Sequence, residues 1–238
     1  MHQIINELAK NKLAHFAELK TFKHVHEPAI DIALSGKSEL QGKWHSFFGN
    51  ENPITLELGC GKGEYTVGMA RMYPDRNFIG VDIKGARIWR GAKTVDEEGI
   101  SNAAFLRMRI EFMASFFGKE EVDEIWLTFS DPQMKEEREK HRLSHPRYLD
   151  IYRKFVVPGA WIHMKTDSRF LADYTLEVLK EEGIEADFIA HDLYGDDWDR
   201  LTEEDKKHMQ LKTFYEQKFL VKGVPINYIR FRLYDKKR

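Results

Sequence analysis

The segment ITLELGCGKG, residues 54–63, decides the fold class of this chain of 238 residues. A short apolar run comes first, glycines then stand at positions 59, 61 and 63, and a helical pattern follows over 65–72. A strand, a glycine-rich loop and a helix in this order are typical of a nucleotide-cofactor site. Glycine suits such a loop because its backbone turns sharply and approaches a ligand without a Cβ in the way. The segment therefore predicts a cofactor loop; the alternative is a tight strand-to-helix turn that binds nothing.

A second apolar run, over 77–82, ends in the carboxylate of Asp82. It follows the glycine loop by about 20 residues, the offset at which an acidic residue meets ribose hydroxyls. A carboxylate suits two neighbouring hydroxyls because it accepts two hydrogen bonds at once. Glu64 stands where a dinucleotide fingerprint has its third glycine, so the spacing argues against a nicotinamide cofactor. Asp82 also suits the N-cap of the next helix, and the two roles can coexist.

Strand-like and helix-like segments alternate along the chain. Strands are predicted over 54–58, 78–82, 103–108, 124–129 and 160–166, with a late one over 226–234. Helices are predicted over 65–72, 86–98, 111–117, 146–155 and 170–182. This alternation predicts an α/β fold with a mostly parallel sheet that helices cover on both faces. Residues 1–52 are expected to form an N-terminal helical extension, with one amphipathic helix up to Leu19, ahead of a domain over 53–238.

Composition narrows the class of protein. Hydrophobic residues make up 42% of the chain, which suffices for a sizeable core, and no apolar run approaches the roughly 20 residues that span a bilayer. The first 20 residues are too polar for a signal peptide. The single cysteine, Cys60, excludes an internal disulfide and fits a reducing cytoplasm. His24 and His26 lack the further ligands that a metal site needs, so no metal is expected.

Charge is distributed unevenly although the net charge is only −2. Basic residues dominate 218–238, and acidic residues dominate 185–205. Separate basic and acidic regions on a near-neutral chain are what a polyanion-binding face would look like. If the partner is a nucleic acid, Lys222, Arg230 and Arg232 are expected to contact its phosphates. The alternative is an ordinary solvated surface.

The fourth predicted strand ends in the segment TFSDPQMK, residues 128–135, which contains Asp131. Ligands of parallel α/β sheets bind beyond the carboxyl ends of the strands. Asp131 should therefore face the same crevice as Glu57, Gly59 and Asp82. The proline that follows Asp131 holds the turn extended, and a charged loop comes next. The alternative is a turn aspartate followed by a solvated loop.

The order of these segments resembles the bacterial tRNA (guanine-N7)-methyltransferases. That family carries E-x-G-x-G-x-G, an acid that ends the second strand, F-P-D-P-W-x-K with a basic follow-on, a T-D after the fifth strand and a T-x-x-E near the C-terminus. The matching segments here are 57–63, Asp82, 129–135, 166–167 and 213–216, which extend over about two thirds of the chain. Each short motif alone is unspecific, but five in the right order make the resemblance specific.

The resemblance implies a Rossmann-like class I methyltransferase fold with a mostly parallel, seven-stranded sheet and S-adenosylmethionine as the cofactor. It implies methyl transfer to N7 of a guanine in tRNA, at position 46 in the variable loop of the tRNA. The expected catalytic residue is Asp131. The expected cofactor-binding residues are Glu57, Gly59, Gly61, Gly63, Asp82, Arg109 and Asp131. The expected substrate-binding residues are Lys135, Asp167, Thr213 and Glu216.

The chain departs from the family's pattern at several positions. Ser130 replaces the first proline of the F-P-D-P-W-x-K motif, and Gln133 replaces its tryptophan. Three glutamates dilute the basic follow-on, in which Lys135, Arg138 and Arg142 are the candidates for phosphate contacts.

The residue near the adenine is left open between two candidates. At the end of the third strand, where the family usually has an acid or amide, Arg109 is the positional match and Glu111 the chemical one. Two substrate candidates also have structural alternatives, because Asp167 suits a strand-end cap and the segment 213–216 suits a helix cap.

Other functions are considered beside this one. They are an RNA-binding module without turnover, a nicotinamide-dependent oxidoreductase, and a methyltransferase that acts on another RNA or a small molecule. The first is opposed by the complete set Glu57, Gly61, Asp82 and Asp131, and the second by the glycine spacing. The sequence leaves the oligomeric state open between monomer and homodimer.

Overall fold

The computed structural model describes residues 13–234, of which residues 13–19 are helical. The first part of the predicted amphipathic helix, with Ile4, Ile5 and Leu8, lies outside the described residues. The end of the basic tail, residues 235–238, also lies outside them. No helix within 13–234 is both long enough and apolar enough to cross a membrane.

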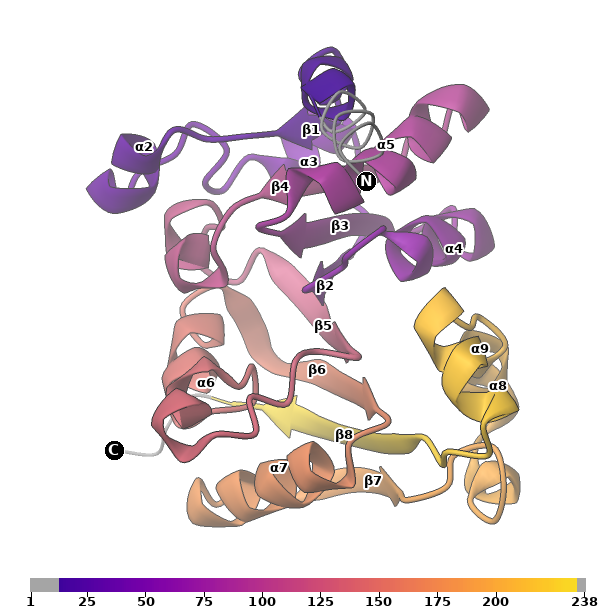
Figure 1. Cartoon of the computed structure of the whole chain (residues 1–238). Coiled ribbons are helices and arrows are strands. Elements are labelled where there is room, and N and C mark those ends of the chain that lie inside the picture. Colours follow the sequence, from indigo (N-terminus) through magenta and orange to yellow (C-terminus); the bar gives the residue numbers. More distant parts are fainter. Residues whose placement is uncertain (1–12, 235–238) are drawn as a thin grey trace, which may run out of the picture.

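An eight-stranded sheet in the order β1-β4-β3-β2-β5-β6-β8-β7 organises the described residues (Figure 1). The pairings from β1 through β6 are parallel, while β8 runs antiparallel to β6 and β7. The strands are β1 (Val25–His26), β2 (Ile54–Leu58), β3 (Asn77–Asp82), β4 (Ala103–Arg107), β5 (Val122–Thr128), β6 (Val156–Thr166), β7 (Ala186–Ala190) and β8 (Asn227–Leu233). The prediction of a mostly parallel sheet is confirmed.

The predicted strand number, seven, is wrong by one because of β1. This two-residue strand pairs Val25 with Phe105 of β4 and so extends the sheet at its edge. Two residues are too few to show the alternation of apolar and polar residues that indicates a strand in a sequence. The segment around β1 belongs to the predicted N-terminal extension. The described part of that extension packs on the rest at Trp44, which is buried and donates from its indole nitrogen to the carbonyl oxygen of Phe116 at 2.9 Å.

Helices flank both faces of the sheet, as predicted. The α-helices are α2 (Ile30–Ser35), α3 (Trp44–Phe48), α4 (Glu64–Met72), α5 (Gly85–Glu98), α6 (Pro146–Tyr152), α7 (Arg169–Glu181), α8 (Glu203–Met209) and α9 (Phe214–Val221). Within residues 13–234 there are also three 3-10 helices, namely η1 (Ile110–Ser115), η2 (Glu136–His141) and η3 (Trp198–Arg200). For the acidic segment 185–205, only the charge is interpreted from the sequence, and no strand or helix is predicted. In the structure this segment contains β7, η3 and the start of α8.

Two apolar cores lie on opposite faces of the sheet because successive strand residues point to opposite sides. Within β4, Leu106 belongs to one core and Phe105 to the other. The first core includes residues of α3, α6 and α7, and the second includes residues of α4, α5 and α8. Figure 1 shows α8 and α9 together beside the sheet, on the same side as α4. The sheet is thereby held rigid between two packed layers, with its strand ends left free for a site.

Candidate active site

A cleft of about 750 Å³ opens at the carboxyl ends of the parallel strands. Its volume falls within the range of roughly 300–1,000 Å³ that small-ligand sites occupy. It brings together five residues that the sequence marked: Gly59, Asp82, Arg109, Asp131 and Asp167. Asp82 ends β3, and the other four follow β2, β4, β5 and β6, as expected for strands whose carboxyl ends meet at one edge of a sheet.

The glycines of the loop after β2 serve different purposes. All three have left-handed backbones, with φ of +78° at Gly59, +57° at Gly61 and +70° at Gly63. A Cβ on Gly63 would lie 2.5 Å from a ring carbon of Phe105, so this glycine lets the start of α4 pack against β4. A Cβ on Gly61 would meet no protein atom within 4 Å. Gly61 therefore faces open space in which a ligand can approach the backbone.

Glu57 does not line the cleft. It is buried, and its carboxylate accepts hydrogen bonds from the Thr66 amide at 2.9 Å, the Thr66 hydroxyl at 2.5 Å and the Thr128 hydroxyl at 2.6 Å. Burial raises the pKa of Glu57 to about 7, although the hydrogen bonds from Thr128 and Thr66 oppose the rise. In this structure Glu57 fixes the start of α4 and the end of β5 behind the cofactor loop.

Asp82 and its neighbours form one wall of the cleft. One carboxylate oxygen of Asp82 accepts from the Gly61 amide at 2.9 Å, and the other accepts from the Lys84 amide at 2.8 Å. Its remaining lone pairs can accept from ribose hydroxyls. Ile83 lies beside it with 54% of its surface exposed, and Met108 adds further apolar lining. A carboxylate next to an exposed apolar surface suits the ribose and adenine of S-adenosylmethionine.

Ile83 was missed by sequence reasoning. A signal was present, because an apolar residue directly after a strand-end acid stands where the chain leaves the sheet and faces its carboxyl edge. The choice between Arg109 and Glu111 is not decided by geometry, since both line the cleft and pair with each other at 3.1 Å. Burial opposes ionisation of Glu111, but the pair with Arg109 outweighs it and lowers the pKa of Glu111.

Asp131 stands in a strained turn. The residues Phe129 and Gln133 on either side have φ of +50° and +45°, which is uncommon for residues other than glycine. Asp131 is exposed to the cleft, and its carboxylate accepts from the Gln133 amide at 3.0 Å. Such strain persists only when surrounding contacts hold it, and it is typical of functional sites.

Arg142 supplies part of that support. The sequence suggested that it contacts phosphate, but only 4% of its surface is exposed. Its guanidinium donates to the carbonyl oxygens of Pro132 and Gln133, each at 3.2 Å, and lies 4.3 Å from the ring centre of Tyr174. Its charge is thus used inside the protein, and the expected phosphate contact is corrected to an internal one.

The four substrate candidates are placed in three different ways. Asp167 lines the cleft half-buried, and burial raises its pKa. Lys135 is exposed but lies outside the cleft lining. Thr213 and Glu216 lie behind the cleft wall, where each side chain caps the start of α9 by bonding to the other residue's amide. Glu216 has no exposed surface.

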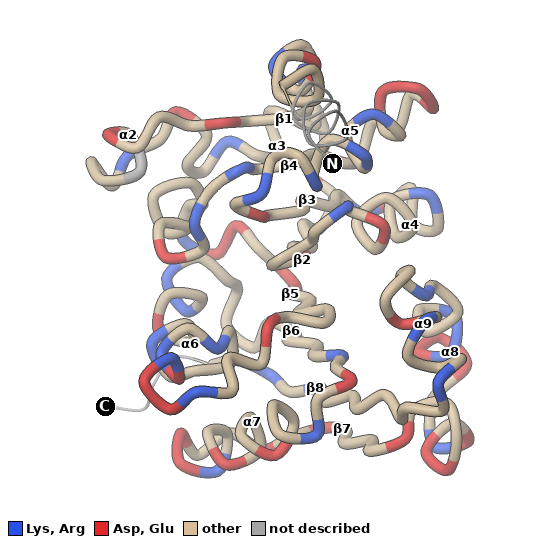
Figure 2. The backbone as a smooth tube through the Cα atoms, viewed as in Figure 1, with Lys and Arg blue, Asp and Glu red and all other residues tan. Residues whose placement is uncertain are grey.

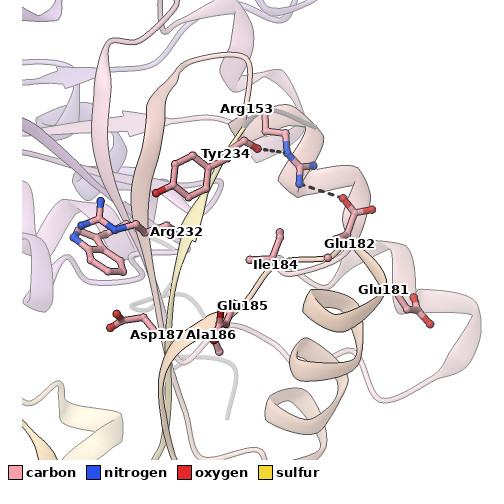
Figure 3. Close-up of a pocket in the computed structure, with 11 residues that line it drawn as sticks. Arg153, Glu181, Glu182, Ile184, Glu185, Ala186, Asp187, Arg232 and Tyr234 are labelled. Carbon is pink, nitrogen blue, oxygen red and sulfur yellow. Dashed lines mark hydrogen bonds and ion pairs between the residues drawn. The ribbon is translucent and has the colours of Figure 1, made fainter. Parts of the chain in front are cut away.

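A second hollow, of about 930 Å³, lies at the opposite edge of the sheet (Figure 3). Its wall includes the ion pair of Arg153 and Glu182 at 3.1 Å, and Tyr234. It surrounds the start of β7, at the edge where the parallel strands begin. It contains Arg232, a predicted phosphate contact, but none of the predicted catalytic, cofactor-binding or substrate-binding residues. Although it is larger, its position argues against a cofactor site, because ligands of such sheets bind at the carboxyl ends.

Comparison with known sequences identifies the family. The chain is 48% identical over 226 residues to a tRNA (guanine-N(7)-)-methyltransferase of Christiangramia forsetii, covering 94% of this chain and 99% of that protein. The chain belongs to the tRNA (guanine-N7)-methyltransferase family. A family model described as "Putative methyltransferase" matches residues 51–228. A family member of the same name from Bacillus subtilis is 34% identical over 196 residues, covering 82% of this chain and 88% of its own.

Solved structures agree on the fold. The 16S rRNA methyltransferase KamB aligns with a TM-score of 0.59 at 12% identity, covering 83% of this chain and 94% of that one. A protein described as an antibiotic related methyltransferase aligns with a TM-score of 0.58 at 18% identity, covering 83% and 96%. At such identities the likeness concerns the fold, which for this family member is that of a class I methyltransferase.

Proposed function

We infer that this chain transfers a methyl group from S-adenosylmethionine to N7 of a guanine in tRNA. The observation that carries the inference is the joint placement of Asp82 and Asp131 in one cleft of a chain that is 48% identical to named enzymes over 94% of its length. The variable loop of the tRNA is the proposed target region, and the cytoplasm is the proposed location.

The reaction needs little from the protein beyond alignment and charge. The in-plane lone pair of guanine N7 forms the new bond to the methyl carbon, while the bond from that carbon to sulfur breaks and sulfur keeps the electron pair. N7 carries no proton, so no general base is required. Positive charge moves onto the purine during the step, and a carboxylate nearby stabilises it. Asp131 is the proposed carboxylate because it is exposed to the cleft from a rigidly held turn.

The remaining residues of the cleft have proposed binding roles. Asp82 would accept from the ribose hydroxyls, and the open backbone at Gly61 would lie against the cofactor. Asp167, half-buried on the far wall, would accept hydrogen bonds from the N–H donors of the guanine edge. Lys135 lies outside the lining, so its proposed contact is with the RNA backbone beyond the base.

One experiment tests the inference directly. Unmodified tRNA is incubated with the protein and S-adenosylmethionine that carries a labelled methyl group, and the modified nucleotide is mapped. The expected product is a single 7-methylguanosine. A tRNA whose target carries 7-deazaguanine, which lacks N7, is the control and should stay unlabelled. Label on another atom, or on no RNA at all, would refute the proposed function.

A further inference from the structure

The start of α9 is fixed from the inside by Glu216. One carboxylate oxygen receives the ammonium of Lys165 and the hydroxyl of Tyr194, each at 2.5 Å. The other accepts from the Thr213 amide at 3.3 Å. All of these partners belong to the protein, and the Lys165 and Glu216 side chains have no exposed surface. Releasing Glu216 to read a base would leave a buried ammonium unpaired, which is costly.

The same helix start is fixed a second time to the cofactor loop. The Phe214 amide donates to the Glu64 carboxylate at 2.9 Å, and the Lys62 ammonium lies 5.2 Å from the centre of the Phe214 ring. Lys62 and Glu64 flank the last glycine of the loop. The position of α9 is therefore set relative to the cofactor cleft.

Between these two anchors stands Tyr215. It lines the cleft together with Asp131 and is 48% exposed. Within the described part of the chain, its one aromatic ring partner is Phe214, in a T-shaped pair with the ring centres 5.8 Å apart, and about half of the residue is open to solvent. Behind it in the same lining, Phe219 stacks on Phe129 with the ring centres 6.2 Å apart. A half-exposed aromatic side chain that lines the cleft from a doubly anchored helix start is suited to contact a planar base.

We propose that the ring of Tyr215 stacks on the target guanine and that the Thr213–Glu216 cap serves to hold it there. This inference rests on the proposed function. Stacking of a base on an aromatic side chain contributes about 1–3 kcal/mol. The electron-rich ring face also favours the positive charge that the purine acquires during methyl transfer. Tyr215 therefore stabilises both the bound base and the transition state, whereas Glu216 positions it from behind.

The test compares four variants with the wild type under single-turnover conditions. Tyr215→Ala is expected to lower the rate constant divided by the tRNA Kd by roughly 5- to 150-fold, the equivalent of the stacking energy. Its Kd for S-adenosylmethionine should stay within about threefold. Tyr215→Phe should remain near wild type, and Tyr215→Leu should be closer to the alanine variant. Tyr234→Ala, which removes a tyrosine of similar exposure (57%) at the far edge of the sheet, is the matched control and should not change the rate.

Each other result overturns the proposal. A wild-type rate for Tyr215→Ala or for Tyr215→Leu would mean that no aromatic face is needed. Equal losses for the phenylalanine and alanine variants would assign the effect to the hydroxyl group. A weakened cofactor Kd would place Tyr215 on the adenine instead. In all of these cases the wild type still produces 7-methylguanosine, so failure of this proposal is distinguishable from failure of the proposed function.

Discussion

The carboxylates of Glu57, Asp82 and Asp131 have different roles because their burial and hydrogen bonds differ. Glu57 is enclosed and receives three hydrogen bonds from the protein, so it organises the loop from behind. Asp82 accepts from two backbone amides yet borders the cleft, which leaves lone pairs for a ligand. Asp131 is exposed and receives a single backbone hydrogen bond, which leaves its charge available for the reaction.

Replacement of Asp131 by asparagine separates binding from chemistry. Asparagine keeps the shape and can still accept from the Gln133 amide, but it removes the negative charge. Because the charge acts on the transition state more than on bound cofactor, we expect kcat to fall by at least about 100-fold. The Kd for S-adenosylmethionine, measured by calorimetry, should stay within about tenfold. Turnover close to the wild-type value would show that another group stabilises the cationic purine.

Gly61→Val tests whether the loop binds a ligand. A β-branched residue at a φ of +57° is strained, and its side chain would occupy the open space over the loop. Gly99→Val is a matched control, since Gly99 has a φ of +65°, equally open surroundings and a place at the end of α5. Both variants should lose about 1–2 kcal/mol of stability. Only Gly61→Val should lose cofactor affinity. If the two variants bound the cofactor equally well, the loop would be a structural turn that does not bind it.

The raised pKa of Glu57 predicts a pH-dependent stability. The pKa is about 7 in the folded state against 4.5 for the free side chain. Between these values the folded state holds the proton that the unfolded chain releases, so the free energy of unfolding falls as the pH rises. From pH 5 to pH 7.5 the loss should be roughly 2 kcal/mol greater for the wild type than for Glu57→Gln. Urea unfolding of both proteins at the two pH values measures it, and parallel pH profiles would contradict a raised pKa.

At the scale of elements, most strands and helices between residues 54 and 182 were predictable, whereas β1, β7, α2, α3 and α8 were not predicted, and neither were the non-local contacts. The prediction of a strand over 54–58 is confirmed to the residue, and the helix over 86–98 begins one residue earlier. The predicted helix over 111–117 is instead the 3-10 helix η1, a difference that apolar periodicity does not resolve. The T-x-x-E motif was recognised, with a helix cap as one alternative. Its ion pair with Lys165 was not foreseen, because no local pattern links residues 51 positions apart.

The turn that carries Asp131 depends on an arginine that looked like part of a charged surface. Arg142→Lys keeps the charge but loses the planar group that bonds two carbonyl oxygens and packs on Tyr174. We expect kcat to fall by about tenfold because the reacting groups are aligned less well. The salt dependence of tRNA binding should stay unchanged. Arg147→Lys, at an exposed neighbour, is the control. If the salt dependence of tRNA binding changed while kcat did not, Arg142 would contact phosphate, as the sequence suggested.

At the scale of the whole molecule, the position of the basic residues matters more than their number. The arginines of β8, which the sequence suggested for phosphate contacts, are engaged within the protein. Arg230 donates to Asp187 at 2.8 Å and to Asp205 at 2.5 Å, and Arg232 lies 3.8 Å from the ring centre of Trp161. Around α7, β7 and β8, basic segments lie beside acidic ones (Figure 2). The acidic and basic regions seen in the sequence therefore partly neutralise each other in the fold.

The cleft itself has basic residues at its rim that offer an alternative face for RNA. Lys84, Arg87 and Arg138 are exposed and line the cleft, and none has an ion-pair partner within residues 13–234. A tRNA whose guanine enters the cleft must bring its backbone past this rim. The rim cations are therefore better placed for phosphates than those of β8.

Salt titrations of tRNA binding distinguish the two faces. Each phosphate contact adds roughly 0.7–0.9 to the slope of log affinity against log salt, because it releases counterions. Replacing Lys84, Arg87 and Arg138 together by glutamine should flatten the slope by about 2. Replacing Lys222, Arg230 and Arg232 should leave the slope unchanged and lower the melting temperature instead, since Arg230 and Arg232 bond β8 to the segments packed beside it. If only the replacement of Lys222, Arg230 and Arg232 flattened the slope, the RNA would bind the face around β8. If both triple variants flattened it, the RNA would contact both faces.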